Sequence, residues 1–172
     1  MLVKEFIQGP FLSEIRSMTF YKDEEDNIKT HAYLGFQLLS SAIEFLGACL
    51  DQYDWSERNM SEKRFKLAIK DLFDKKYEPY NKGGKFDLYS NLRCSMVHSS
   101  RPGNNIGLSE TANNATHLSL NNDSLTLVFE DFLNDFENAC KKVVDLIDKK
   151  IITHEKVYDH VLYTPQDFKS FN

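Results

Sequence analysis

The chain has 172 residues, of which 41% are hydrophobic and 27% are charged, and its formal net charge is -5 at pH 7. These values predict one soluble domain over residues 1–172, large enough to bury a core, and argue against a general nucleic-acid binder that works by positive charge alone. No apolar run reaches the roughly 18 residues of a membrane helix, and the N-terminal MLVKEFIQGP lacks the apolar core of a signal peptide. We therefore expect a cytoplasmic protein with no membrane partner.

The cysteine and histidine spacings predict neither disulfides nor a metal site. Cys49, Cys94 and Cys140 are odd in number and far apart, as is usual for reduced thiols in the cytoplasm. His154 and His160 lack helical ligand spacing and have no acid or cysteine set nearby. We expect no cofactor.

Taken in chain order, the hydrophobic pattern predicts an all-α fold, an antiparallel bundle of four to five helices. Gly9-Pro10 interrupts the apolar pattern, and Pro10 suits the first turn of a helix over about 10–20. The polar run 21–27 is expected to be a loop. The most hydrophobic stretch, about 29–53, should be the central helix, with Leu38, Leu39, Ile43 and Leu46 buried.

The second half of the chain continues this pattern, with one exception. Further core helices are expected over about 61–76, 85–99 and 130–151, and a small β-hairpin is inserted near 117–128, where apolar residues alternate around a turn sequence. The tail 152–172 carries too many apolar residues to be free, so it should pack on the bundle or on a second subunit.

Glu44 is the one charge in the middle of the central helix. A carboxylate in apolar surroundings needs a partner or a functional reason. A basic residue on a neighbouring helix is the simpler expectation, and catalysis is the alternative.

The segment DLYSNLRCSMVHSSR, residues 87–101, is the best candidate for chemistry. At 100° per residue its apolar stripe is Leu88, Tyr89, Leu92 and Met96, with Arg93 and His98 on the polar side. Arg93 and His98 are then about 140° apart around the helix axis and about 7.5 Å apart along it, close enough to contact one phosphate. A histidine near a helix C-terminus is favoured as imidazolium and can donate a proton.

Further residues of this segment are candidates for substrate binding. Asn91 and Ser95 share the polar side of the helix, and Ser99 and Arg101 follow at its end, beside a loop rich in Gly and Asn that suits anion binding. Residues 61–101 carry five more basic than acidic side chains, whereas the rest of the chain has a balance of -10. A solvated lysine face accounts for this surplus nearly as well, and an Arg93 carboxylate pair with a capping His98 is the structural alternative.

Two segments of the chain resemble the HEPN superfamily: LLSSAIEFLGACL, as a core helix, and LRCSMVHS, which holds an Arg-x4-His motif. These all-α bundle proteins occur in bacterial toxin–antitoxin, abortive-infection and RNA-processing systems. The likeness covers roughly residues 10–151. Two features depart from the family pattern: Cys94 stands where active members commonly have a polar residue, and the hairpin is an addition.

The resemblance implies metal-independent RNA cleavage that leaves a 2′,3′-cyclic phosphate and a 5′-OH. Arg93 would hold the phosphate and His98 would be the general acid or base, in a site shared between the subunits of a homodimer. RNA and a cognate antitoxin or other protein would be the partners. Two other interpretations stay open: a non-catalytic dimeric helical interaction module, and a small-molecule enzyme.

Overall fold

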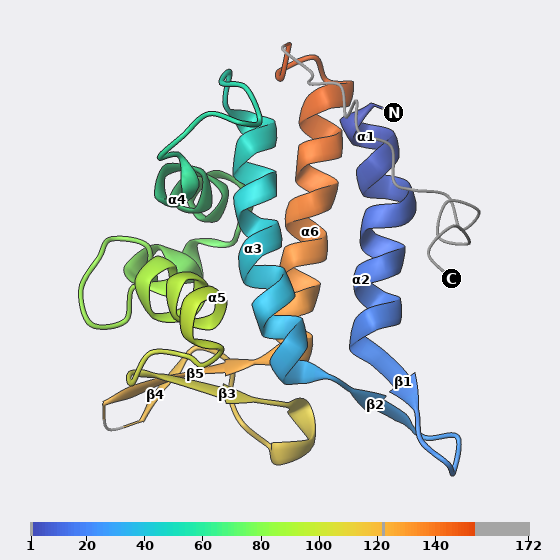
Figure 1. Ribbon diagram of the computed structural model, residues 1–172, viewed down its shortest axis with the longest axis vertical. Helices are drawn as coiled ribbons and strands as arrows, with labels where there is room; N and C mark the ends of the chain where they lie inside the picture. Colours follow the sequence, from blue (N-terminus) through green and yellow to red (C-terminus); the bar gives the residue numbers. More distant parts are fainter. Residues whose placement is uncertain (1, 122, 154–172) are drawn as a thin grey trace, which may run out of the picture.

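Helices α3, α6 and α2, the last extended by the helical turns before it, stand side by side in the computed structural model, which describes residues 2–121 and 123–153 (Figure 1). Helices α3 and α6 run in the same direction and α2 runs against them, so the expected antiparallel bundle is only partly realised. Helices α4 and α5 cross α3 on the side away from α2, and the strands lie at one end. The bounds are α2 (Leu12–Thr19), α3 (Ala32–Leu50), α4 (Ser61–Leu72), α5 (Ser95–Ser99) and α6 (Phe129–Asp148).

The expectation of an all-α fold is wrong, because the protein is a mixed α/β structure. Within the described residues 59% of the structure is helical, counting the π and 3₁₀ segments with the six α-helices, and 13% is strand, in five strands. Strands β1 (Phe20–Lys22) and β2 (Ile28–Thr30) form an antiparallel ribbon. The second sheet has the order β3-β5-β4, from β3 (Ile106–Ser109), β4 (Ser119–Asn121) and β5 (Ser124–Val128).

The strand pairings explain why the sequence pattern missed this sheet. The hairpin expected near 117–128 exists as β4 and β5, with Ser119 opposite Thr126. Its other neighbour, β3, pairs parallel to β5 and comes from a polar segment that we expected to be irregular. A four-residue strand is stabilised by its partner strand and by burial of residues such as Ile106 and Leu125, neither of which shows in its own periodicity.

Helix boundaries differ most where the backbone is not α-helical. The first helix begins earlier than residue 10, because α1 (Val3–Phe6) and a π-helical turn η1 (Ile7–Phe11) precede α2. The helix expected over 61–76 ends at Leu72 and is followed by the 3₁₀ helix η2 (Lys75–Tyr80). The helix expected over 85–99 consists of the π-helical η3 (Tyr89–Cys94) and α5, and a short 3₁₀ turn η4 (Thr111–Asn113) lies in the loop after it. Of the expected packed tail, Ile152 is buried, and residues 154–172 lie outside the described part.

Helix α3 is the core of the fold, as expected. Leu39, Ile43 and Leu46 are fully buried, and Leu38 is half-buried. By length and composition alone α3 is apolar enough to cross a membrane, and 56% of its most apolar 18-residue stretch is buried inside the protein. The three cysteines are free thiols, which confirms the expectation of no disulfide.

Helices α3 and α4 meet with no room for a side chain at Gly47. A Cβ atom there would lie 1.8 Å from the carbonyl oxygen of Arg64, and that oxygen belongs to backbone that cannot rotate away. Only glycine permits this approach of the two helices.

We predict that Gly47→Ala destabilises the fold by about 3 kcal/mol, at the upper end of overpacking costs, because α4 must move as a unit. Urea unfolding followed by circular dichroism measures the loss. Gly107→Ala in β3 is the control, since the nearest atom to its Cβ position is the rotatable hydroxyl of Ser124 at 3.3 Å and not backbone. Equal stability of Gly47→Ala and wild type would contradict this helix crossing.

A buried polar cluster connects η2, the β-sheet region and α6. The amide N–H of Val128 donates to Nδ1 of His117 at 3.0 Å, so the ring proton is on Nε2, which lies 2.8 Å from the Tyr77 hydroxyl oxygen. That hydroxyl in turn donates to Asp135 at 2.8 Å, and Tyr77 is fully buried. The cluster thus requires a neutral imidazole. Burial, and then the charge of Lys76, lower the pKa of His117 below its ordinary value.

This lowered pKa predicts a loss of stability in mild acid. Unfolded chains bind a proton on His117 at higher pH than folded ones, so the contribution is complete above about pH 6.5 and falls as the pH drops below that value. Thermal melting of wild type and His117→Gln at pH 7.5 and 5.5 tests this. Wild type should lose more stability between the two pH values than His117→Gln does, and equal losses would show that His117 does not titrate with unfolding.

Candidate functional site

The Arg-x4-His segment is fixed in place by its first residue and its apolar stripe. Asp87, only 2% exposed, caps the helical run, because its Oδ2 accepts the Ser90 N–H at 3.2 Å and the Ser90 hydroxyl at 2.9 Å. Leu88, Leu92 and Met96 are fully buried against the core, which confirms the predicted stripe, although Tyr89 is only half-buried. The other side of this run carries Arg93 and His98.

Arg93 pairs with Glu44 on α3. Its Nη2 lies 2.7 Å from Glu44 Oε2, and the two side chains are 16% and 22% exposed. This confirms the expectation that Glu44 has a basic partner on a neighbouring helix. The contact is an ion pair without a hydrogen bond. Among the described residues neither Glu44 Oε2 nor the buried Nε of Arg93 has a hydrogen-bond partner.

The helix is wider around Arg93 than an α-helix. Residues 89–94 form a π-helical turn, and the hydroxyl of Ser95 donates to the carbonyl of Ser90 five residues earlier. The guanidinium carbon of Arg93 lies 5.8 Å from the centroid of the Tyr89 ring, within cation–π range. Burial, followed by a hydrogen bond with Cys94, raises the pKa of Tyr89 to about 12. The π turn invalidates the 100° rule used for the sequence and leaves Arg93 against Tyr89 and Glu44.

Arg93 and Glu44 line a cavity of about 300 Å³ on the surface of α3. Its other walls come from α3, from α4 and from the loop between them: Ser41, Phe45, Ala48, Trp55 and Arg64. The cavity thus combines two guanidinium groups, one carboxylate and an aromatic surface. That set suits an anion attached to a flat or apolar group.

The Trp55 wall is held by a buried ion pair. Arg64 Nε donates to Asp51 at 2.7 Å, its Nη1 donates to the Trp55 carbonyl at 3.0 Å, and its Nη2 donates to the Asp54 carbonyl at 2.7 Å. The Trp55 ring stacks on Phe45 with centroids 5.6 Å apart and an interplanar angle of 9°. Since its donors are used in this way, Arg64 builds the wall, whereas Arg93 is held by its ion pair with Glu44.

His98 is exposed near the C-terminal end of α5 and does not belong to the lining of this cavity. Ser100 caps that end in the left-handed region (φ 48°), and its carbonyl accepts a hydrogen bond from the Tyr33 hydroxyl of α3. Arg93 and His98 therefore lie on one helical run but face different surroundings within a single chain.

The four candidate substrate-binding residues fall into two groups. Asn91 and Ser95 are half-buried and already bonded: the Asn91 amide donates to the carbonyls of Lys85 and Asp87, and Ser95 bonds to Ser90 as described. Ser99 and Arg101 are exposed beside His98. Their side chains make no hydrogen bond or ion pair with the described part of the chain, so they are the pair available to a ligand.

Sequence reasoning missed Tyr89, Trp55 and Arg64 as parts of the site. Tyr89 was assigned to the apolar stripe, and the other two come from a connection and from α4, which only the tertiary fold brings to Arg93. No group of three or more His, Cys, Asp or Glu side chains able to hold a metal ion occurs in residues 2–121 and 123–153. His154 and His160 lie outside the described residues.

Comparisons of this chain with models of protein families, with curated proteins and with solved structures find no match.

The surroundings of the two motif residues predict different stability losses. Arg93→Ala leaves the Glu44 carboxylate without its cation in a partly buried position, so it should cost about 1–3 kcal/mol. His98→Ala at an exposed position should cost about 0.5 kcal/mol or less. Urea unfolding of both variants, with Arg101→Ala as the exposed control, measures these values. A larger loss for His98→Ala than for Arg93→Ala would mean that the ion pair is not formed in solution.

Proposed function

We propose that this protein is a HEPN-like, metal-independent endoribonuclease of the cytoplasm that works as a homodimer. The observation that carries the proposal is the guanidinium of Arg93, which lines an open cavity beside Glu44 and stands on the same helical run as an exposed histidine. A guanidinium in the wall of a cavity is suited to a phosphate, and an exposed imidazole near a helix C-terminus is suited to proton transfer.

Arg93 and His98 have different roles in the cleavage. The ribose 2′-oxygen attacks the adjacent phosphorus, so that a 2′-O–P bond forms, the bond to the 5′-oxygen breaks, and the products are a 2′,3′-cyclic phosphate and a 5′-OH. Arg93 stabilises the charge that develops on the phosphate oxygens. His98 transfers one proton, either from the 2′-hydroxyl or to the leaving 5′-oxygen, and solvent water accepts or supplies the other. In this scheme the phosphate replaces Glu44 as the partner of Arg93.

A second subunit is needed because His98 does not belong to the Arg93 cavity. Around the His98 end of the helical run, α3 and α5 expose apolar side chains: Leu34 is 61%, Tyr33 is 45% and Val97 is 36% exposed. Burying this surface between two copies supports a two-fold dimer that places His98 of one copy at the Arg93 cavity of the other.

The Arg93–Glu44 pair favours a second candidate, a non-catalytic dimeric helical module. An arginine already paired with a carboxylate is a structural element that needs no substrate. The same apolar surface would then serve only for association with a second copy or with another protein.

Replacing either motif residue should abolish RNA cleavage. We expect His98→Ala and Arg93→Ala each to lower the rate on single-stranded RNA by at least about 100-fold, because the first removes the general acid or base and the second removes a charge that stabilises the transition state. The double variant should be no slower than the singles, because each change disables the same step. Added EDTA should not inhibit, and the rate should fall as salt rises. Gel analysis with detection of the cyclic phosphate measures all four effects, with Arg58→Ala as an exposed, charge-matched control.

Mixing the two inactive variants distinguishes the site arrangements. In a composite dimer, an Arg93→Ala chain paired with a His98→Ala chain retains one complete site, so random exchange should restore about a quarter of wild-type activity. If the mixture recovers no RNA cleavage, each site takes its Arg93 and its His98 from the same chain. Wild type that is folded and dimeric but cleaves no RNA would favour the module instead.

A further inference from the structure

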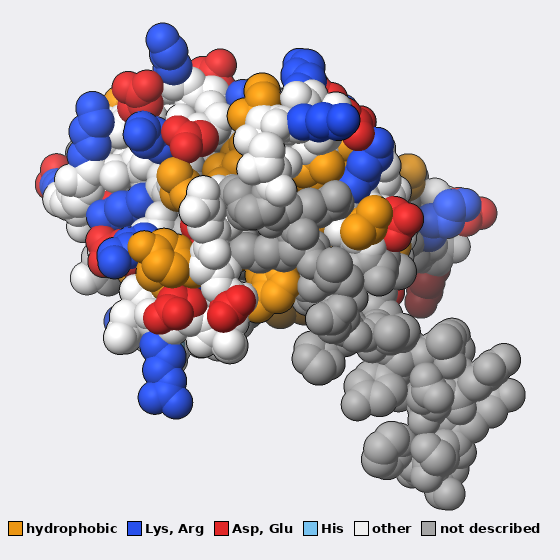
Figure 2. Space-filling model, turned by 90° about the horizontal axis from the view of Figure 1, so that it is seen from above, with side chains coloured by type: hydrophobic (Ala, Val, Ile, Leu, Met, Phe, Trp, Pro, Cys, Tyr) orange, Lys and Arg blue, Asp and Glu red, His pale blue; other side chains and the backbone are white. Residues whose placement is uncertain are grey.

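A second cavity, of about 590 Å³, lies on the outer face of α4, away from the motif residues. Three of its lysines lie on α4 and the fourth on the segment after η2: Lys63, Lys66, Lys70 and Lys82. Leu67, Glu78 and Asn81 complete the lining. The lysines of α4 recur at helical spacing, so they stand on one face around Leu67. In Figure 2 lysine and arginine side chains are present on the side where Figure 1 places α4, among aspartate and glutamate side chains, and others lie on the opposite side.

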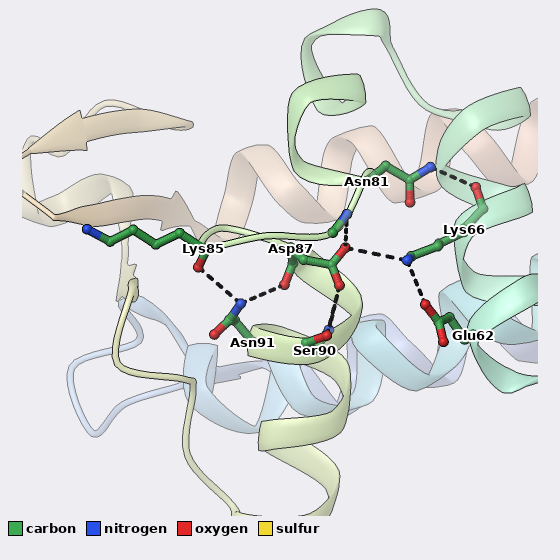
Figure 3. Close-up of polar contacts among 8 residues, drawn as sticks. Glu62, Lys66, Asn81, Lys85, Asp87, Ser90 and Asn91 are labelled. Carbon is green, nitrogen blue, oxygen red and sulfur yellow. Dashed lines mark hydrogen bonds and ion pairs between the residues drawn. The ribbon is translucent and has the colours of Figure 1, made fainter.

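The wall opposite α4 is held rigidly by a network around Asp87 (Figure 3). The Asn81 amide donates to the Lys66 carbonyl at 2.9 Å, and the Gly83 N–H donates to Asp87 Oδ1 at 3.2 Å. Lys66 lies between Glu62 at 2.6 Å and the buried Asp87 at 3.9 Å, so carboxylates offset its charge. The network keeps segment 81–87 against α4 and leaves the cavity preformed.

The remaining charge of the cavity is positive and unused. Lys63 and Lys82 are exposed and form no ion pair with any described residue, and Lys70 has only Asp71 at 4.0 Å. Asn81 Oδ1, buried beside the cavity, has no hydrogen-bond partner among the described residues. The lining between these polar groups is mainly apolar, because Leu67 and the aliphatic stems of the lysines form it.

These properties select one class of ligand. Lysine ammonium groups at the rim bind phosphate, and an apolar floor favours a flat ring over a bare anion. The carboxylate of Glu78 disfavours a simple polyanion and accepts hydrogen bonds from amino or hydroxyl groups. A volume of 590 Å³ is within the usual range for small-molecule sites.

We infer that this lysine-lined cavity binds a nucleotide, with the phosphate at Lys63 and Lys82 and the base over Leu67. The ligand is either a free nucleotide or one nucleotide unit of an RNA strand, and only the second source rests on the proposed ribonuclease function. Binding here requires neither Arg93 nor His98.

Calorimetry with two probes tests the inference: adenosine 5′-monophosphate, and a single-stranded 2′-O-methyl RNA octamer that lacks the hydroxyl needed for cleavage. Lys63→Ala/Lys82→Ala should weaken binding at least tenfold. Lys141→Ala/Lys149→Ala removes the same charge on and beside α6 and should change binding less than about twofold. Leu67→Trp fills the cavity without changing charge and should weaken binding as much as the lysine variant does.

The relative affinity of the two probes identifies the source. Binding of the monophosphate as tightly as the octamer identifies a free nucleotide, and binding of the octamer alone, or at least tenfold more tightly, identifies RNA. A wild type that binds neither probe, or a Leu67→Trp variant that binds as well as wild type, overturns the inference. RNA cleavage measured in parallel separates the two proposals. Nucleotide binding without cleavage supports the nucleotide site and rejects the ribonuclease function. If Lys63→Ala/Lys82→Ala cleaves RNA with an unchanged KM and binds both probes as well as wild type does, the nucleotide site is rejected and the ribonuclease proposal stands.

Discussion

The contact between Gly47 of α3 and the carbonyl of Arg64 of α4 sets the positions of both candidate sites. Because the helices touch backbone to backbone, the Arg64 side chain reaches under the loop between them and bonds Asp51 and the carbonyls of Asp54 and Trp55. Those bonds hold Trp55 against Phe45 and so form the outer wall of the Arg93 cavity. The same placement of α4 directs its lysines away from the core.

Charge pairing explains why the buried and half-buried ionic groups of this region are tolerated. Arg64 and Asp51 are 6% and 8% exposed and satisfy each other directly. Asp87 is satisfied by two backbone amides, a hydroxyl and the more distant Lys66. Arg93 and Glu44 form the exception, because their contact leaves donor and acceptor atoms unused. A pair with unmet hydrogen bonds is the one that a phosphate can most easily replace, since it offers the guanidinium better-directed acceptors.

Sequence periodicity was informative where burial alone decides the structure. It failed where contacts with distant segments of the chain, or a departure from α-helical geometry, decide it. The core positions Leu39 and Ile43 and the stripe Leu88, Leu92 and Met96 follow from a repeating apolar face. The partner of Glu44 was expected from the cost of an unpaired carboxylate. Strand β3 was missed because its stability comes from β5, and the π turn was missed because the 100° rule assumes an α-helix. Periodicity also gives no sign that Asp87 is buried, because its burial follows from its capping role.

Helix α4 is a wall common to both cavities, and this arrangement limits how their ligands can influence each other. Arg64 faces the Arg93 cavity, while its sequence neighbour Lys63 lines the lysine cavity, so the two ligands do not compete for one side chain. Asp87 contacts Lys66 of α4 and also caps the helical run that carries Arg93, roughly 9 Å further along its axis. A ligand that draws Lys66 toward its phosphate would weaken the charge partner of this cap. Asp87 thus connects the two sites as a contact separate from α4 itself, because it touches Lys66 and is otherwise bonded only to backbone amides and one hydroxyl of its own segment.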